Sequence, residues 1–175
     1  MHVSIQPLRV EDAPAIVDAE DDETVRWLSG QPSTMEGTAA YVARLADDAA
    51  SGKGKRAFGI WVDGQCVGTV DYDPDGVDGC ESGDVNIAYG VAPWVRGRGV
   101  AVRAVELMCE MIRDQGIGTR AIIRADERNP ASAHVAEKAG FVHLRNMLTE
   151  EGEAGHRGPA TMRVFGRDLR PRDSA

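Results

Sequence analysis

The chain has 175 residues, of which 42% are hydrophobic and 27% are charged. This length fits one domain with its own core, and the composition is typical of a soluble globular protein. No apolar run approaches the roughly 20 residues that a membrane helix needs, so a membrane-spanning helix is excluded. The formal net charge of −8 argues against nucleic acid as the main partner, because phosphate binding needs a basic surface.

The N-terminal sequence and the cysteines indicate where such a protein would work. The first residues lack both the cationic start and the apolar stretch of a signal peptide, so we expect a cytoplasmic protein without membrane contact. The cysteines Cys66, Cys80 and Cys109 are odd in number, widely spaced and unmatched by clustered histidines. We therefore expect reduced thiols and no metal site.

The first third of the chain predicts a short strand followed by helices. Apolar and polar residues alternate over 5–9, as in a strand, and Glu11-Asp12-Ala13-Pro14 suits the first turn of a helix. A second short helical piece is expected over 24–28. Ser33 or Thr34 can then cap a longer helix.

The middle of the chain predicts a hairpin and a further strand. Two apolar runs, 58–62 and 66–70, flank Asp63-Gly64, which is a strong signal for a two-residue hairpin turn. An exposed acidic loop is expected over 74–83. The next strand is expected over 85–91.

The last part of the chain alternates helices and strands. After Pro93, apolar residues recur with helical spacing, and Gly116 and Gly118 end this helix. The residues expected on its buried face are Val100, Ala104, Leu107, Met108, Met111 and Ile112. A strand over 121–123, a helix over 131–139 and strands over 141–147 and 161–165 complete the pattern.

This order of elements predicts an α/β sandwich, in which helices flank a mixed, mostly antiparallel central sheet. We expect one domain over residues 1–170 and a frayed tail over 171–175. Cofactor chemistry is expected at the strand-to-helix junction that follows Val91.

Charge along the chain is unevenly distributed. Residues 57–95 contain no lysine or arginine but seven acidic residues, and Arg96, Arg98 and Arg103 follow immediately. This arrangement predicts an anionic cofactor beside a cationic substrate. The spacing of Asp71, Asp73 and Asp75 resembles the start of a calcium loop, but the glutamate at its twelfth position is missing, so we do not assign calcium there.

The residues between Val91 and Ala101 have the composition of a diphosphate site. A strand ends here, Gly97 and Gly99 form a tight turn, and an amphipathic helix begins. Glycines let the backbone approach a ligand, and the helix N-terminus adds partial positive charge. Arginine can hold phosphate through two hydrogen bonds.

Two motifs in this part of the chain resemble the GNAT superfamily of N-acetyltransferases. Arg96-x-x-Gly99-x-Ala101 matches the loop that binds the coenzyme A pyrophosphate in that family, and the run around it is close to the ribosomal-protein-alanine acetyltransferase branch. The segment 129–141, with its Asn, Ser, Lys and Gly-Phe, is similar to the family's second element. The coenzyme contacts that the resemblance implies are Val91, Arg96, Gly97, Arg98, Gly99, Val100, Ala101, Asn129 and Ser132.

The resemblance implies direct acetyl transfer from acetyl-CoA to an amine, with a backbone N–H near Val91 polarising the acetyl carbonyl. Many relatives carry a glutamate base where this chain has Asn86, so Asp84, Glu81, a base elsewhere or solvent are the alternatives. Many also place an acidic tyrosine where this chain has Ala136. Ser132 is then a plausible proton donor, although helix capping or a pantetheine contact explains it equally well.

The sequence thus predicts an acetyl-CoA-dependent N-acetyltransferase acting on a peptide N-terminus or a small cationic amine. A sensor that binds acetyl-CoA without turnover is the alternative from another class, and transfer of a longer acyl group is a third. Tyr89 could reach the cleft, although a strand tyrosine more often packs in the core. The resemblance is also compatible with a homodimer, which is common in the family.

Overall fold

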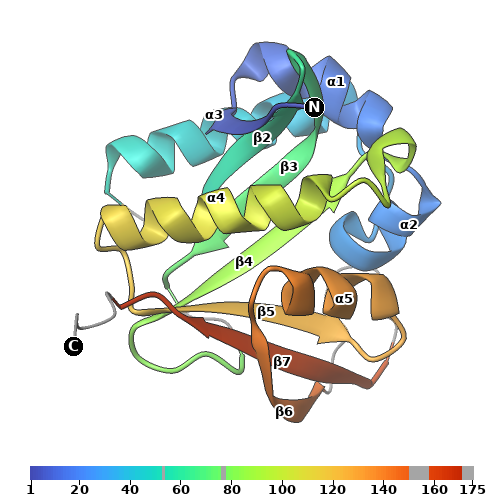
Figure 1. Ribbon diagram of the computed structural model, residues 1–175. Coiled ribbons are helices and arrows are strands. Elements are labelled where there is room, and N and C mark those ends of the chain that lie inside the picture. Colours follow the sequence, from blue (N-terminus) through green and yellow to red (C-terminus); the bar gives the residue numbers. More distant parts are fainter. Residues whose placement is uncertain (53, 76–77, 150–157, 171–175) are drawn as a thin grey trace.

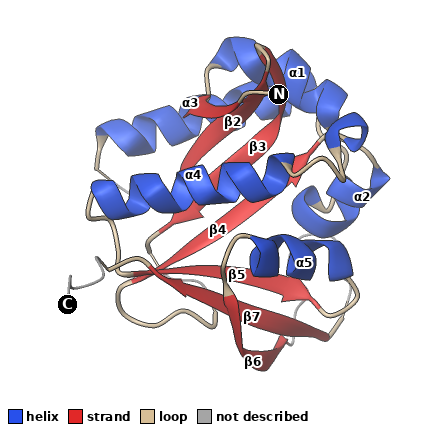
Figure 2. Ribbon diagram, in the orientation of Figure 1, coloured by secondary structure: helices blue, strands red, loops and turns tan. Residues whose placement is uncertain are grey.

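Seven strands form one sheet with helices on both of its faces in the computed structural model, which describes residues 1–52, 54–75, 78–149 and 158–170 (Figures 1 and 2). The elements in chain order are β1 (Val3–Pro7), η1 (Val10–Asp12), α1 (Ala13–Ala19), α2 (Asp22–Thr24), η2 (Val25–Ser29), α3 (Met35–Ala50), β2 (Arg56–Val62), β3 (Gln65–Asp73), β4 (Asp84–Val91), η3 (Pro93–Val95), α4 (Val100–Asp114), β5 (Arg120–Asp126), α5 (Pro130–Lys138), β6 (Val142–Thr149) and β7 (Ala160–Asp168). Among the described residues, no helix has the length and apolarity needed to cross a bilayer.

The described strands include one parallel pair of neighbours, and these two strands separate along their length. The strand order is β1-β2-β3-β4-β5-β7-β6, and only β4 and β5 run parallel. Their pairing covers Asp84–Asn86 against residues 120–122 and extends no further along either strand. The remaining residues of β4, up to Val91, therefore diverge from β5 and leave a splayed gap in the middle of the sheet.

The hairpin before this parallel pair follows from its turn residues. Asp63 and Gly64 both adopt the left-handed conformation, with φ of 48° and 88°, as a tight turn between β2 and β3 requires. The predicted turn is confirmed. β3, however, continues to Asp73, so the prediction that the strand ends at residue 70 was wrong and Asp71 belongs to the sheet.

The helix α4 lies along the sheet (Figure 1). It packs against the sheet through one apolar stripe. The side chains that it buries are Val100, Ala104, Val105, Met108, Cys109 and Ile112. Each larger one contributes about 1.5–3 kcal/mol by leaving water. Leu107 and Met111, which were expected on this face, are only half-buried, because the buried stripe is turned toward Val105 and Cys109.

The order and type of the predicted elements agree with the structure, and the predicted fold class is confirmed. The tail expected over 171–175 lies outside the described residues.

Candidate functional site

Two cavities meet at the gap between β4 and β5. The first, of about 790 Å³, lies between the loop before α4, the start of α4 and α5, and we call it the α4 cavity. The second, of about 720 Å³, lies between α1, η2, α3 and the strands β3 and β4, and we call it the α3 cavity. The residues that line both are Thr24, Trp27, Leu28, Ile87, Tyr89, Gly90, Val91 and Arg124. A molecule in one cavity can therefore reach a molecule in the other through the gap.

The loop at the start of α4 has the predicted anion-binding geometry. Gly97 and Gly99 adopt φ of 71° and 80°, a left-handed conformation that glycine takes without strain. Gly99 is the N-cap of α4 and carries no side chain that could cap the first turn. The N–H groups and the dipole of this turn are thus available to a phosphate in the α4 cavity, which Val100 and Ala101 line.

The two arginines of the loop do not both face this cavity. The terminal nitrogens of Arg96 each lie 2.7 Å from an Asp21 carboxylate oxygen, and its Nε donates to the Val91 carbonyl at 3.1 Å. The Arg96 guanidinium is the main reason that the pKa of Asp21 lies well below its usual range. Arg96 lines the α4 cavity, whereas Arg98 is exposed and lines neither cavity.

The backbone of Val91 is oriented toward the gap. The N–H of the next residue, Ala92, donates to Val67 of β3 at 2.8 Å, and the Val91 carbonyl accepts from Arg96. Backbone groups of successive residues point to opposite edges of a strand. The Val91 N–H therefore points away from β3 and toward the gap, as its predicted role in polarising a carbonyl requires.

Asn129, Ser132 and Tyr89 come together on the other wall of the α4 cavity. Asn129 is the N-cap of α5, and its Oδ1 accepts the Ser132 N–H at 3.1 Å. The Tyr89 hydroxyl lies 3.1 Å from the Ser132 Oγ and donates to the Ser132 carbonyl at 3.1 Å. Burial raises the pKa of Tyr89 to about 12. All three residues line the cavity, so two neighbouring hydroxyl groups are available for proton transfer.

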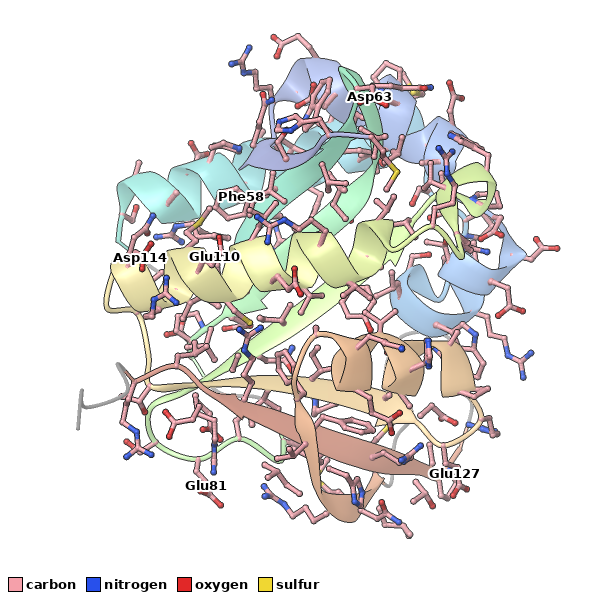
Figure 3. All side chains as sticks on the ribbon, viewed as in Figure 1. Phe58, Asp63, Glu81, Glu110, Asp114 and Glu127 are labelled. Atoms are coloured by element: carbon pink, nitrogen blue, oxygen red, sulfur yellow. The ribbon has the colours of Figure 1, made fainter. Side chains whose placement is uncertain are left out.

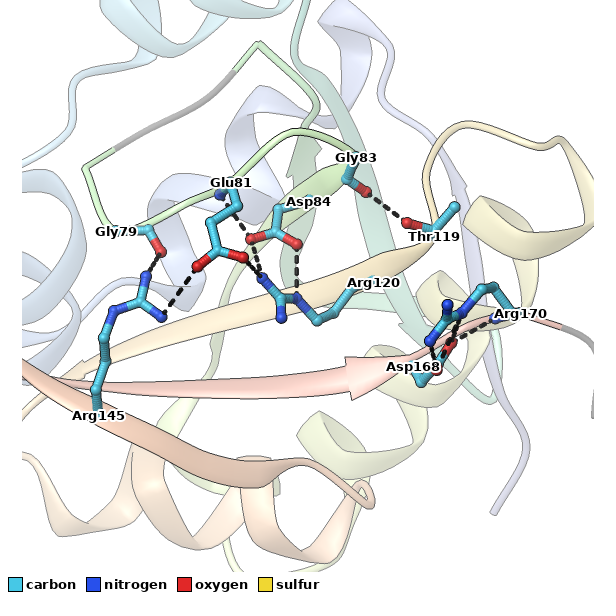
Figure 4. A network of polar contacts seen from close by, with 9 residues as sticks. All are labelled: Gly79, Glu81, Gly83, Asp84, Thr119, Arg120, Arg145, Asp168 and Arg170. Carbon is cyan, nitrogen blue, oxygen red and sulfur yellow. Dashed lines mark hydrogen bonds and ion pairs between the residues drawn. The ribbon is translucent and has the colours of Figure 1, made fainter.

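The two carboxylates predicted as bases lie outside both cavities, and Figure 4 shows them together in one network of polar contacts. Asp84 is 4% exposed and accepts two hydrogen bonds from Arg120, at 2.7 and 2.9 Å, and one from the Glu81 N–H at 2.8 Å. Burial opposes ionisation of Asp84, but these hydrogen bonds outweigh it and lower its pKa. Seven residues of strand, or about 23 Å, separate it from Val91.

Glu81 belongs to the same ion-pair network. Its carboxylate oxygens contact Arg120 at 2.8 Å and Arg145 at 3.8 Å, and neither Glu81 nor Asp84 lines either cavity (Figure 4). In Figure 3 Glu81 lies toward the end of the molecule that holds Asp114, the last residue of α4, whereas the candidate anion loop is at the other end of that helix. The structure thus separates these two residues from the predicted coenzyme site.

The sequence left the position of one residue open and misplaced others. Tyr89 could have reached the cleft or packed in the core, and the structure places it in the lining of both cavities. Asp71, Asp73 and Asn86 line the α3 cavity, but the strand was ended before the two aspartates. The signal was available, because the polar residues Thr69, Asp71 and Asp73 alternate with apolar Val70 and Tyr72 as on a two-faced strand.

Comparison with known proteins agrees with this geometry. A model of the acetyltransferase (GNAT) domain matches residues 2–142. A ribosomal-protein-alanine acetyltransferase from Vibrio fischeri superposes with a TM-score of 0.79 and 18% identity, over 97% of this chain and 94% of that chain. RimL, a ribosomal alpha-N-protein acetyltransferase in complex with coenzyme A, gives 0.78 and 16%, over 95% and 93%.

An aminoglycoside acetyltransferase, AAC(6')-Ib in complex with coenzyme A, is also similar, with a TM-score of 0.74 and 19% identity over 93% of this chain and 94% of that chain. A comparison with curated protein sequences gives no match. The domain match spans most of the chain and the fold agrees with it, so the chain belongs to the acetyltransferase (GNAT) domain family.

Proposed function

We propose that the protein transfers the acetyl group of acetyl-CoA to a primary amine. The observation that carries this proposal is the meeting of two cavities at the β4–β5 gap. Coenzyme A occupies the α4 cavity, with its pyrophosphate on the N–H groups of residues 97–101 and its pantetheine arm beside Asn129. The acceptor occupies the α3 cavity. Similar structures were determined in complex with coenzyme A or acetyl-CoA.

The reaction joins the two molecules in the gap. The amine nitrogen attacks the thioester carbon, and the Val91 N–H donates a hydrogen bond to the carbonyl oxygen as negative charge develops there. The new C–N bond forms, the C–S bond breaks, and the electron pair of that bond leaves with the sulfur. Holding both reactants on a rigid sheet supplies much of the rate, because attack becomes effectively unimolecular.

Proton transfers accompany the reaction. The departing thiolate takes a proton from the hydroxyl pair of Tyr89 and Ser132, which faces the α4 cavity. The acceptor ammonium first loses one proton to solvent in the α3 cavity, since only the neutral amine is a nucleophile, and the second proton, which its nitrogen loses as the amide forms, returns to the hydroxyl pair through solvent. We assign no part in this step to Asp84, since its carboxylate is bound to Arg120 and lines neither cavity.

The acceptor is a peptide N-terminus or a small cationic amine. Similar structures are named as acetyltransferases of ribosomal proteins and of aminoglycosides. The carboxylates of Glu20, Asp71 and Asp73 line the α3 cavity of this chain and favour a positively charged acceptor.

The test is release of free coenzyme A thiol from acetyl-CoA in the presence of peptides, aminoglycosides, polyamines or amino acids. Turnover with one class, well above the hydrolysis seen without amine, supports the transferase and names its acceptor. Acetyl-CoA binding without turnover on any class supports a sensor instead, which the absence of a carboxylate at Asn86 favours. Replacing acetyl-CoA by longer acyl-CoA molecules in the same assay tests the range of acyl groups.

Three further points belong to this proposal. Residues 1–170 act as one catalytic domain, the enzyme works in the cytoplasm where acetyl-CoA is available, and two copies form a homodimer. Cell fractionation and sedimentation of the purified protein test the last two points separately from activity.

A further inference from the structure

One wall of the α3 cavity is a polar face of two paired strands. Thr69, Asp71 and Asp73 of β3 line the cavity, and Asn86 of β4 lies directly opposite Asp73 in the register. Asn86 is therefore the diagonal neighbour of Asp71 on the same face of the sheet, with Cα atoms about 7–8 Å apart. A group between their side chains can contact both.

Two oxygen atoms on this wall lack a hydrogen-bond partner within the described parts of the chain. They are Asp71 Oδ1 and Asn86 Oδ1, and both are buried. The Asp71 side chain is 15% exposed, and its other oxygen, Oδ2, lies 3.1 Å from the Lys55 ammonium. A buried acceptor without a partner costs about 1–3 kcal/mol, so two such atoms beside one cavity indicate a donor that comes with a ligand.

The other carboxylates that line the α3 cavity already accept hydrogen bonds from the protein. Glu20 accepts hydrogen bonds from the Ser33 N–H at 2.6 Å and the Ser33 hydroxyl at 2.7 Å. Asp73 Oδ1 accepts the Asp75 N–H at 3.0 Å. Burial raises the pKa of the Asp71 carboxyl, and the Lys55 ammonium only partly offsets this effect. A second cation at Asp71 would therefore stabilise its charged form.

The position of Asp71 distinguishes this cation from the amine that reacts. Attack on a carbonyl held by the Val91 N–H keeps the attacking nitrogen within about 6 Å of that amide. Asp71 is three residues along β3 from Gly68, which pairs with Val91, so the two backbones are about 11 Å apart. The Asp71 side chain stands roughly perpendicular to the sheet and the Val91 N–H points away from β3, so neither shortens this separation, and one nitrogen cannot satisfy both contacts.

We propose that Asp71 and Asn86 bind a second ammonium group of the acceptor, which makes the acceptor a diamine, a polyamine or an amino sugar with at least two amines. This inference rests on the proposed function, because it places the acceptor in the α3 cavity. Lys55 holds one oxygen of Asp71 and limits the site to a single extra cation.

The experiment is calorimetric titration of the coenzyme A complex at pH 8 with 1,8-diaminooctane, whose two nitrogens are far enough apart to reach both positions, and with octylamine as the matched ligand with one charge. Asp71→Asn should weaken the affinity for 1,8-diaminooctane at least tenfold and change that for octylamine less than threefold. Asp78→Asn removes the same charge from an exposed residue that lines neither cavity, and should change neither affinity.

A second variant, which is expected to bind more tightly, excludes misfolding as the explanation for a loss of affinity. Lys55→Met removes the internal ammonium that competes for Asp71, so it should tighten 1,8-diaminooctane binding about three- to tenfold. Undetectable binding of 1,8-diaminooctane to the wild type would overturn the proposal. Equal losses for both ligands in Asp71→Asn would do the same.

Turnover is measured on the same samples and separates this proposal from the activity. Binding that depends on Asp71, without acetylation of any amine, would contradict the transferase and leave the cation site standing. Acetylation that is indifferent to Asp71→Asn would contradict the cation site alone.

Discussion

Arg96 and Asp21 are 75 residues apart in the chain, yet the two terminal nitrogens of Arg96 each lie 2.7 Å from an oxygen of Asp21. Asp21 is the N-cap of α2, and Thr24 of the same helix lies 3.2 Å from Arg96. The loop that precedes α4 is thus tied to a segment that lines both cavities. The arginine that the motif assigns to pyrophosphate binding thus also joins the proposed coenzyme side of the site to the proposed acceptor side.

A double-mutant cycle tests whether Arg96 positions α2. Arg96→Ala, Asp21→Asn and the double variant should each lower kcat/KM for the amine by about five- to tenfold, because any one of them breaks the same link. The coupling should be about 1–2 kcal/mol, typical of residues in contact. The dissociation constant of coenzyme A should change less than threefold in all of them.

A different set of results would show that Arg96 binds the pyrophosphate of coenzyme A. In that case Arg96→Ala alone would weaken coenzyme A at least tenfold, and Asp21→Asn would tighten it by releasing the guanidinium. Titration of each variant with coenzyme A, without an acceptor, distinguishes the two results.

The glycine that begins α4 offers a second test. Gly99→Glu places a carboxylate at the N-terminus of α4, where the pyrophosphate of coenzyme A is proposed to lie, and should weaken coenzyme A more than 100-fold. Gly116→Glu is the matched control, because Gly116 also adopts a left-handed φ with open space around it but lies beyond the end of α4.

Both substitutions impose a similar backbone strain of about 1–2 kcal/mol, which thermal unfolding measures. Equal coenzyme A affinities in the two variants would show that the loop does not hold the phosphates.

The fold was predicted from sequence features that each involve only a few neighbouring residues. The turn at Asp63-Gly64, the glycines before α4 and the helical spacing after Pro93 each depend on a few neighbouring residues. Such signals survive in any tertiary context, because they arise from backbone conformation and side-chain periodicity. The candidate anion loop was predictable for the same reason.

The partners of charged residues were not predictable in this way. Asp84 and Arg120 are 36 residues apart and meet because the parallel pairing of β4 and β5 places them opposite each other. No residue near Asp84 in the sequence indicates that an arginine will bind its carboxylate. Asp71 was misplaced for a related reason, since an aspartate within a strand resembles the start of a loop until the α3 cavity on that face is known.

Substitution of Tyr89 or Ser132 tests whether this hydroxyl pair protonates the thiolate as it leaves. Tyr89→Phe should lower kcat about 100-fold and leave the coenzyme A dissociation constant within a factor of three, because the proton is needed only as the C–S bond breaks. Ser132→Ala should have a smaller effect, since Tyr89 keeps the Ser132 carbonyl as a partner. Tyr72→Phe is the control, a buried tyrosine that lines neither cavity.

The pH profile provides an independent check on Tyr89. With a pKa of about 12 this hydroxyl stays protonated throughout the working range, so it should contribute no fall in rate below pH 10. A fall near pH 8–9 that disappears in Tyr89→Phe would contradict the raised pKa.

Asp84 should matter for stability in acid. Its pKa is lower in the folded protein than in the unfolded chain, so its contribution is present above about pH 4 and is lost as the pH falls through the folded value. Asp84→Asn should therefore lower the free energy of unfolding at pH 7 by about 3 kcal/mol, because it leaves Arg120 without its buried partner. The midpoint of thermal unfolding should also depend less on pH between 5 and 2.5 than in the wild type.

Glu81→Gln is the control for this variant. Glu81 contacts the same Arg120, but its side chain is 63% exposed, so the loss should stay below about 1 kcal/mol. The pH dependence of acetyl transfer tests whether Asp84 is the catalytic base. The rate should increase with pH in Asp84→Asn as it does in the wild type, since the carboxylate lines neither cavity. A flattened rise in Asp84→Asn, with the fold intact, would instead identify Asp84 as the base and place the acceptor at the far end of β4.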